Sequence, residues 1–368
     1  MVSLAVSYDP RRNTLDAVRV GLALMVAVSH GIVMRTGDEP TWGSSTLGDL
    51  AVDGFFVLSG FLVTGSYQRI DVSIGHAGFW TVVRFGWHRF LRIMPGFWVC
   101  LLVLALVIAP LVAVLEGRPA VTPFVTEPSS WDFIVNNAGL LIRRYDIAGL
   151  LAGTPTPFVF DGALWTLVLE AMCYVLLAVL GWSGVVRRRR WVVLLLAGVL
   201  WALLVAQSLG VGTVIGDDTT RLALMFVLGV ASFLYIDRIP SSPALAVAAL
   251  ILLVGCLAVL HDYRVVGAPA LAYLIVYLGT GLPRPVRLRA DLSYGVYIYH
   301  WPTEQVLMLT GAAVLPTVAF VALALAAVLL PAAASWFLVE KRSLTHKDFA
   351  PLSTWRSRRH AAELVGSK

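Results

Sequence analysis

Charged residues are scarce in this chain of 368 residues. Asp, Glu, Lys and Arg make up 14% of it, whereas about 25% is usual for a soluble domain. Hydrophobic residues reach 58%, and they form blocks long enough to cross a hydrocarbon core about 30 Å thick. This composition excludes an ordinary soluble protein and predicts an all-α polytopic membrane protein embedded in the lipid bilayer.

Cysteine is also rare, and its placement argues against two kinds of site. Cys100, Cys173 and Cys256 lie in apolar segments and lack the spacing of a disulfide framework or a metal site. We interpret them as small packing residues and expect no metal ion and no permanently bound cofactor. No internal repeat is visible, which disfavours a transporter built from repeated halves.

About ten segments are apolar and long enough to form transmembrane helices. They are residues 15–34, 50–68, 95–115, 163–182, 191–209, 220–236, 243–260, 266–282, 291–309 and 312–339. Ten spans place both termini on one side of the membrane. With the N-terminus inside, most of the 28 Lys and Arg residues fall in inner segments, so the positive-inside rule predicts cytoplasmic N- and C-termini in the inner (plasma) membrane.

The net charge of +6 follows from this topology, and we expect no nucleic-acid partner. Residues 1–340 are predicted to form the transmembrane domain, and 341–368 a basic, poorly ordered cytoplasmic tail. The inner stretch 69–94 mixes aromatic and basic residues suited to a membrane surface. The outer stretch 116–162 either caps a cavity or simply connects two spans. The four arginines at 187–190 are interpreted as a topology anchor.

The first predicted span contains two ionisable residues, Arg19 and His30. They are eleven positions apart, about three helical turns, so both side chains share one face and are separated by about 16 Å along the axis. Ionisable residues inside a membrane helix are costly and usually mark function. The alternative is a snorkelling arginine and a histidine bonded to a neighbouring carbonyl.

Two carboxylates lie in the second and fourth spans. Asp53 is expected either to pair with a cation such as His30 or to lie at the water interface. Glu170 sits within an apolar helix with Tyr174 as its i+4 neighbour on the same face. Its expected partner is His30 or an inner arginine, and a purely structural ion pair is the alternative.

Two arginines precede a proline at the predicted inner surface. Arg89 and Arg92 have i, i+3 spacing, which places both on one face of a helix, and Pro95 suits the first turn of the third span. Guanidinium groups bind phosphate oxygens in bidentate fashion. The pair is therefore a candidate anion site, although spacing alone slightly favours the alternative of generic positive-inside anchoring.

The ninth span opens with the polar-aromatic sequence LSYGVYIYHWP, residues 292–302. Lipid alone would not favour such a helix. It indicates either the wall of an internal binding site or an interfacial aromatic belt. The expected substrate pocket comprises Trp165, Tyr174, Tyr294, Tyr297 and His300.

These features occur together in a known order. Arg19 with His30, then VDGFFVLSGFL, RFLRIMP, LWTLVLEAMCY and LSYGVYIYHWP resemble the bacterial membrane acyltransferases of the acyltransferase-3 type over about residues 12–340. The resemblance implies a ten-helix domain that transfers an acyl group, commonly acetyl, from cytoplasmic acyl-CoA to an acceptor hydroxyl. Members acylate sugars of surface polysaccharides, nodulation factors and macrolides. The chain departs from the family pattern at Tyr299, where a less aromatic residue is usual.

The resemblance also implies roles for individual residues. By position they are the essential histidine His30, its partner Arg19, the paired arginines Arg89 and Arg92, and the Glu-x-x-x-Tyr element Glu170 and Tyr174. On this basis we expect acyl-CoA to be bound by Arg19, Arg89 and Arg92.

Acyl transfer from a thioester needs a general base, which we assign to His30 because its ordinary pKa, about 6.5, suits that work. Glu170 or Asp53 is expected to orient the histidine. Arg19 would guide the pantetheine arm or stabilise the thioester oxyanion.

A different class of protein is compatible with the same residues. In a transporter or flippase of a sugar-linked substrate, the intramembrane charges would form the translocation path. For an acyltransferase, a carbohydrate, a glycolipid and a macrolide are all possible acceptors. The sequence fixes neither the acceptor nor the oligomeric state.

Overall fold

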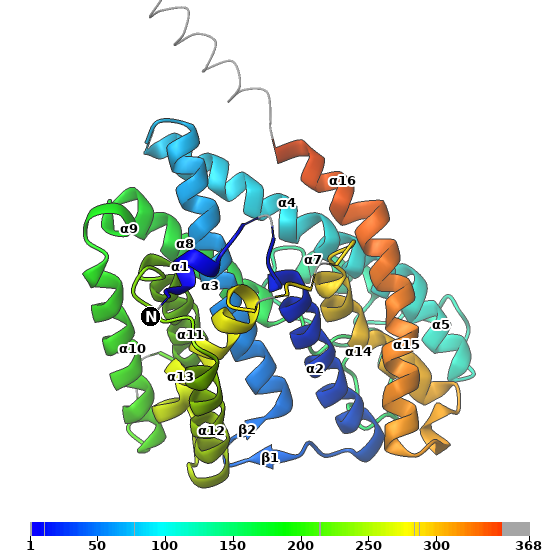
Figure 1. Cartoon of the computed structure of the whole chain (residues 1–368). Helices are drawn as coiled ribbons and strands as arrows, with labels where there is room; N and C mark the ends of the chain where they lie inside the picture. Colours follow the sequence, from blue (N-terminus) through cyan, green and yellow to red (C-terminus); the bar gives the residue numbers. More distant parts are fainter. Residues whose placement is uncertain are drawn as a thin grey trace, which may run out of the picture.

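The computed structural model describes residues 2–10, 12–76, 78–212, 215–282, 284–286 and 288–347. These residues are mostly helical, as the all-α prediction requires (Figure 1). The α-helices are α1 (Leu4–Ser7), α2 (Leu15–Thr36), α3 (Leu47–Ser73), α4 (Phe79–Val103), α5 (Ala109–Leu115), α6 (Thr122–Val125), α7 (Ser130–Asn137), α8 (Thr166–Trp182), α9 (Val185–Arg188), α10 (Trp191–Ser208), α11 (Asp217–Leu234), α12 (Pro243–Val259), α13 (Arg264–Thr280), α14 (Ser293–Leu309), α15 (Thr317–Ser335) and α16 (Lys341–Ser343).

The remaining regular elements are short. Two π-helical turns, η1 (Leu104–Ile108) and η3 (Trp336–Glu340), continue α4 and α15, and two 3₁₀ turns are η2 (Ala312–Val314) and η4 (Leu344–Lys347). Strands β1 (Thr41–Trp42) and β2 (Ser45–Thr46) pair antiparallel between α2 and α3.

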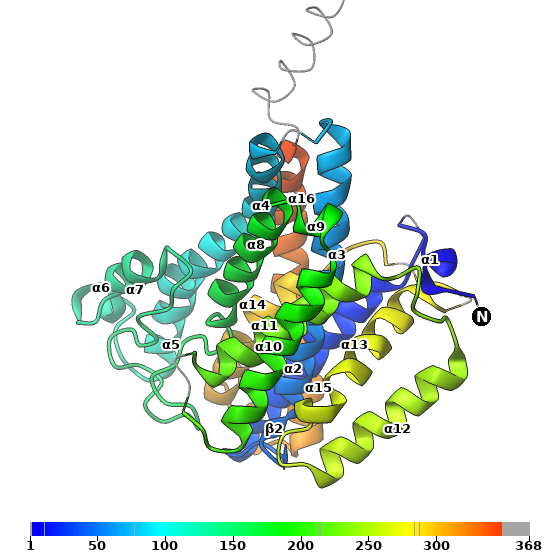
Figure 2. The same cartoon turned by 90° about the vertical axis from the view of Figure 1, so that its left-hand side faces the viewer.

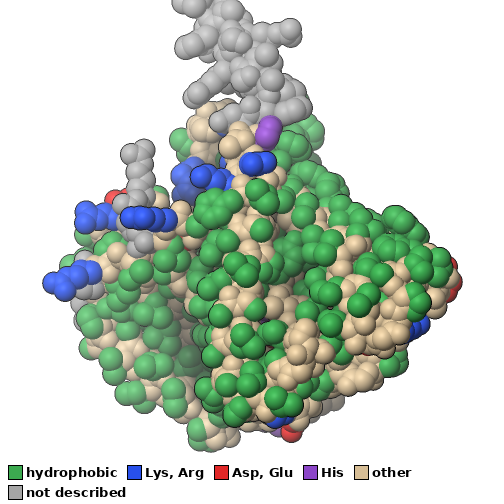
Figure 3. Space-filling model, turned by 90° about the vertical axis from the view of Figure 1, so that its right-hand side faces the viewer, with side chains coloured by type: hydrophobic (Ala, Val, Ile, Leu, Met, Phe, Trp, Pro, Cys, Tyr) green, Lys and Arg blue, Asp and Glu red, His purple; other side chains and the backbone are tan. Residues whose placement is uncertain are grey.

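Each of the ten predicted spans coincides with a helix. Among the described residues, five helical stretches are long and apolar enough to cross a membrane: 15–36, 47–73, 79–115, 191–208 and 317–347. Helices α8, α12 and α13 are also apolar but shorter. Figure 3 shows a largely apolar flank, with most of its Lys and Arg side chains near one end. The chain is a multi-pass membrane protein.

The third span differs from the prediction. Helix α4 begins at Phe79 instead of near residue 95, so Pro95 lies inside a helix and not in its first turn. The inner stretch 69–94, expected at the membrane surface, forms the end of α3 and much of α4. The physical reason is that Phe85 and Leu91 are buried, because this face of α4 packs against neighbouring helices. That packing tolerates the one backbone hydrogen bond that proline removes.

Helix α3 is the centre of the bundle. In Figure 1, α2, α14 and α15 lie on one side of it, and α10, α12 and α13 on the other. Its contact with α11 is a backbone contact. A methyl group added at Gly60 would overlap the carbonyl oxygen of Phe226, and one added at Gly229 would overlap that of Val57. Glycine permits this close approach because it has no side chain.

Segments predicted to be on the inner side gather at one end of the molecule. Figures 1 and 2 place α9, the α3–α4 turn and α16 at the end opposite the β1–β2 hairpin. Which face of the membrane this end occupies stays a prediction. Part of the predicted tail is helical, since α16 and η4 cover residues 341–347, and the Trp87 indole N–H donates to the His346 carbonyl at 3.0 Å. Residues 348–368 lie outside the described residues.

Candidate active site

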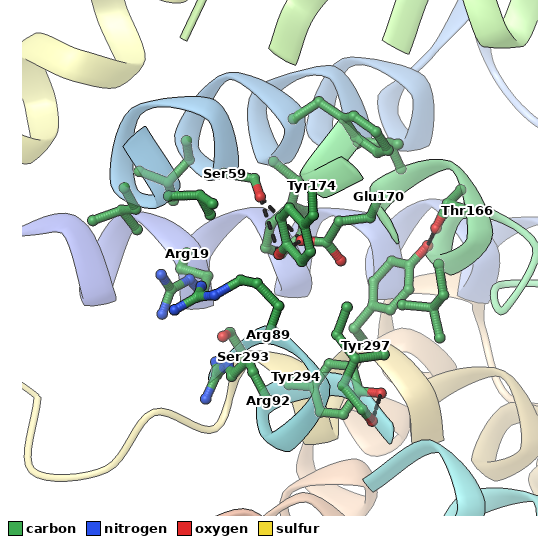
Figure 4. A pocket seen from close by; sticks show the side chains of 18 residues that line it. Arg19, Ser59, Arg89, Arg92, Thr166, Glu170, Tyr174, Ser293, Tyr294 and Tyr297 are labelled. Atoms are coloured by element: carbon green, nitrogen blue, oxygen red, sulfur yellow. Dashed lines mark hydrogen bonds between the residues drawn. The ribbon is translucent and has the colours of Figure 1, made fainter. Parts of the chain in front are cut away.

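A polar cavity lies where α2, α3, α4, α8 and α14 meet (Figure 4). It brings together seven of the residues singled out from the sequence: Arg19, Arg89, Arg92, Glu170, Tyr174, Tyr294 and Tyr297. Its lining does not include the other four, namely His30, Asp53, Trp165 and His300. Trp165 is partly buried at the start of α8, where it packs against the hydrophobic core.

Two of the three arginines share one counter-ion. The Asp291 Oδ2 accepts from the Arg19 Nη1 at 2.6 Å and from the Arg92 Nη2 at 2.6 Å. Burial raises the pKa of the Asp291 carboxyl, but the two guanidinium groups lower it more, so the pKa lies well below its ordinary value. Arg92 also lies 3.7 Å from the Glu340 carboxylate. The charges of Arg19 and Arg92 are therefore largely compensated within the protein.

The third arginine, Arg89, differs from Arg19 and Arg92 in its counter-ions. Within the described part of the chain, Arg89 has no carboxylate oxygen within 4 Å, and its Nε is buried without a hydrogen-bond partner. Its guanidinium carbon lies 5.8 Å from the centre of the Tyr174 ring and 5.9 Å from that of the Phe85 ring. Among the described residues its one side-chain hydrogen bond is a long one, 3.4 Å, to the Ser66 hydroxyl. Arg89 is thus the cation of this cavity best able to bind an anion.

Glu170 is held by hydroxyl groups instead of a cation. Its Oε1 accepts from the Ser59 hydroxyl at 3.0 Å and from the Tyr174 hydroxyl at 2.5 Å. Neither of the expected partners, His30 or an inner arginine, forms an ion pair with it among the described residues. The i, i+4 relation with Tyr174 was visible in the sequence, whereas Ser59 lies on another helix and no sequence spacing pointed to it.

The partner of His30 is His300, a residue predicted to line the substrate pocket. The Nδ1 of His30 lies 2.8 Å from the Nε2 of His300, and the two rings stack at 5.1 Å. The Nδ1 of His300 lies 3.2 Å from the Val296 carbonyl, which can only accept. His300 therefore carries its proton on Nδ1, its Nε2 accepts from the His30 Nδ1–H, and the His30 Nε2 keeps a free lone pair.

Tyr297 connects the polar cavity with the histidine pair. Its side chain lines the cavity, and its ring centre lies 6.1 Å from that of His300. Its hydroxyl donates to the Ala163 carbonyl at 2.9 Å and also bonds to Thr166. Ala163 and the first residue of α8, Thr166, thus fix a ring that lines the cavity and lies beside His300.

Asp53 pairs with a cation, as one of the two sequence interpretations expected, but the cation is Arg264 and not His30. Asp53 is fully buried, and its Oδ2 accepts from the Arg264 Nε at 2.5 Å and from the Tyr263 hydroxyl at 2.7 Å. The Arg221 Nη1 lies 3.7 Å from its Oδ1. The carboxylate joins α3 to α11 and α13, so its geometry is that of a structural ion pair. Its partners come from distant parts of the chain, which no local spacing relates to Asp53.

No group of three or more His, Cys, Asp or Glu side chains within the described ranges is placed to hold a metal ion. The arrangement instead offers a cation for an anionic ligand, a carboxylate held by hydroxyl groups, and an imidazole with a free lone pair.

Comparison with known proteins identifies the family. Residues 12–336 match the acyltransferase domain family of the acyltransferase-3 type. An O-acetyl transferase of Shigella phage Sf6 is 26% identical over 354 residues, which cover 92% of this chain and 98% of that protein. Nodulation protein 10 of Rhizobium leguminosarum bv. viciae is 28% identical over 334 residues, which cover 82% and 85%. No solved structure matches the chain. The protein therefore belongs to the acyltransferase-3 family of membrane acyltransferases.

Proposed function

We propose that this enzyme transfers an acyl group, acetyl in the simplest case, from acyl-CoA to a hydroxyl of a carbohydrate-containing acceptor. The family and the phage relative named as an O-acetyl transferase support the reaction class. The observation that carries the proposal is the His30–His300 pair, which leaves a lone pair on the His30 Nε2 beside an arginine-lined cavity.

The cavity suits the donor. Arg89 would bind the diphosphate of CoA, since it is the arginine without a carboxylate partner, and Arg19 and Arg92 would line the same entrance. Along α2, Arg19 and His30 are separated by about 16 Å. The pantetheine arm has roughly twelve bonds between sulfur and the first phosphate, as in four extended residues, and so spans about 14 Å. A diphosphate at the arginines therefore places the thioester near His30.

The chemical step then needs only the groups already named. The His30 Nε2 takes the proton of the acceptor hydroxyl, and the hydroxyl oxygen bonds to the thioester carbonyl carbon. The carbon–sulfur bond breaks, and the departing sulfur receives the proton back from His30. His300, oriented by the Val296 carbonyl, would hold His30 in the required tautomer, a role that the sequence had suggested for Glu170 or Asp53. The spacing along α2 leaves Arg19 at the entrance and does not favour it as the oxyanion donor.

We also propose that the enzyme resides in the plasma membrane with both termini in the cytoplasm, where acyl-CoA is available. The distribution of Lys and Arg supports this orientation. A polysaccharide, a glycolipid or a macrolide sugar would each present a suitable hydroxyl.

Thioester consumption tests the proposal. Purified protein in nanodiscs is given labelled acetyl-CoA with a panel of glycosides, and released CoA is detected by a thiol reagent. His30→Ala should abolish release, whereas His346→Ala, an exposed histidine near the end of the described chain, should leave it unchanged. Normal turnover in His30→Ala would exclude His30 as the base. Movement of an unmodified sugar-linked substrate without CoA release would favour a transporter.

A second pair of variants tests the role of His300. His300→Phe leaves a buried N–H of His30 without an acceptor, which costs roughly 1–3 kcal/mol, so kcat should fall about ten- to hundredfold. His300→Gln should restore most of the activity, because its Oε1 can accept where the Nε2 of His300 does. Equal loss in both variants would indicate that His300 acts by packing alone.

A further inference from the structure

A second cavity lies at the end of the bundle that carries α9. It has a volume of about 620 Å³, within the range of about 300–1,000 Å³ typical of small-molecule sites. The inner ends of α3 and α8 and the start of α9 line it, and its basic side chains include Arg187, Arg188 and Arg190. The fourth arginine of that run, Arg189, is absent from the lining. We call this space the basic cavity.

The charge of the basic cavity is unbalanced. Arg187 and Arg188 are exposed and form no ion pair among the described residues, while Arg190 lies 3.9 Å from Asp237 and donates to a backbone carbonyl. The acidic side chain in the lining, Asp71, is engaged by His76 at 2.5 Å and by the Thr81 hydroxyl at 2.9 Å. The cavity therefore favours an anionic ligand.

An apolar groove between α4 and α8 joins the basic cavity to the polar cavity. It shares Arg89, Ile93 and Tyr174 with the polar cavity, and Trp182 with the basic cavity. Figure 2 shows α8 beside α4, with α9 at the same end of the bundle. Tyr174 and Trp182 are eight residues apart on α8, which corresponds to about 12 Å.

The succession of polar cavity, apolar groove and basic cavity matches the nucleotide end of acyl-CoA, which lies beyond the diphosphate. With the diphosphate at Arg89, the adenosine and its 3′-phosphate must continue away from His30. The 3′-phosphate lies about six bonds from the diphosphate, as in two extended residues, or about 7 Å, and arginine side chains are long enough to reach the remainder. Trp182 is 66% exposed and lines both spaces, and an exposed indole is a suitable stacking partner for a nucleobase.

We propose that the basic cavity binds the 3′-phosphoadenosine end of the acyl donor, with Arg187 and Arg188 on the 3′-phosphate and Trp182 against the adenine. The inference rests on the proposed use of acyl-CoA and adds where its nucleotide lies. The same cationic chemistry would also accept the phosphate of a lipid headgroup, so the test must distinguish the two sources.

The test compares CoA with dephospho-CoA, which lacks only the 3′-phosphate. Full-length enzyme in zwitterionic nanodiscs should bind CoA at least tenfold more tightly, because charge-assisted phosphate contacts are lost with dephospho-CoA. The double variant R187Q/R188Q should lose this preference and raise the KM for acetyl-CoA about tenfold, with kcat within twofold of wild type. R189Q is the matched control and should retain the preference. Trp182→Ala should weaken the binding of CoA and of dephospho-CoA by the same factor.

Each contrary result has a distinct meaning. Equal binding of CoA and dephospho-CoA by the wild type, or a retained preference in R187Q/R188Q, would overturn this site while leaving the proposed reaction intact. Repeating the measurement in nanodiscs with anionic lipid tests the lipid headgroup as the source of the phosphate. If R187Q/R188Q keeps the preference for CoA and loses only the effect of that lipid on the enzyme, the basic cavity binds headgroups instead. No binding of either nucleotide by the wild type would refute the proposed donor and this site together.

Discussion

Replacing Asp53 by Asn separates a structural carboxylate from a catalytic one. The change keeps the shape of the side chain and removes its charge. Asp53 is fully buried and compensates Arg264, which is itself 3% exposed, and lies 3.7 Å from Arg221. In the variant, two buried guanidinium groups face one fewer anion.

The expected loss in the free energy of unfolding depends on which other partners each arginine keeps in the variant. Removing one partner of a buried ion pair usually costs about 3–5 kcal/mol. Arg264 still has Asp262 at 3.1 Å and the Ser45 hydroxyl at 3.0 Å, and Arg221 still has Asp49 at 2.6 Å. We therefore expect the lower end, about 3 kcal/mol, which for a chain of this length corresponds to a fall in Tm of about 4 °C.

The assay is thermal unfolding of the purified protein in detergent, combined with thioester turnover well below the Tm of the variant. Asp218→Asn is the matched control, since this aspartate also pairs with Arg221 but is 60% exposed, and its loss should cost less than about 1 kcal/mol. Folded Asp53→Asn should turn over acetyl-CoA with an unchanged pH profile. A variant as stable as the wild type but without turnover would refute this reasoning and return Asp53 to the catalytic machinery.

Two further variants probe the scaffold and the entrance. Gly229→Ala should prevent stable folding, because its methyl group would overlap the Val57 carbonyl oxygen, whereas Gly21→Ala, which meets no atom within 4 Å, should leave the yield of folded protein unchanged. Normal folding of Gly229→Ala would contradict the close helix contact. Because the pKa of Asp291 is lowered in the folded state, its stabilisation is complete above its unfolded value, about 3.9, and is lost as the pH falls below it. The Asp291→Asn variant should therefore have a lower Tm than the wild type near neutral pH, and its Tm should fall less when the pH is lowered. Parallel curves of Tm against pH for the two proteins would contradict this linkage.

The helices were predictable because their signals are local. Apolar length placed a helix at each expected span, and the i, i+3 spacing correctly placed Arg89 and Arg92 on one face toward the cavity. The family came from the order of motifs along the chain. Such signals depend on residues within a few turns of one another.

The ionic partners were not predictable by the same means. Asp291 joins Arg19 and Arg92 across distant helices, and Arg264 meets Asp53 although 211 positions separate them. Each pair is selected by how the helices pack, which periodicity does not encode. The start of α4 was missed because its first turns mix basic and aromatic residues, and only tertiary burial of one face makes that segment a helix.

The glycine contact between α3 and α11 bears on how this enzyme's specificity can change. Helix α3 gives Ser59 and Leu62 to the polar cavity, while its opposite face meets another backbone, so repacking of side chains cannot shift this wall. A different donor must then be accommodated by resizing side chains on the other lining helices, among them α8 and α14. Directed evolution toward a different acyl donor is best served by libraries at Leu167 and Tyr294, with α3 and α11 left untouched.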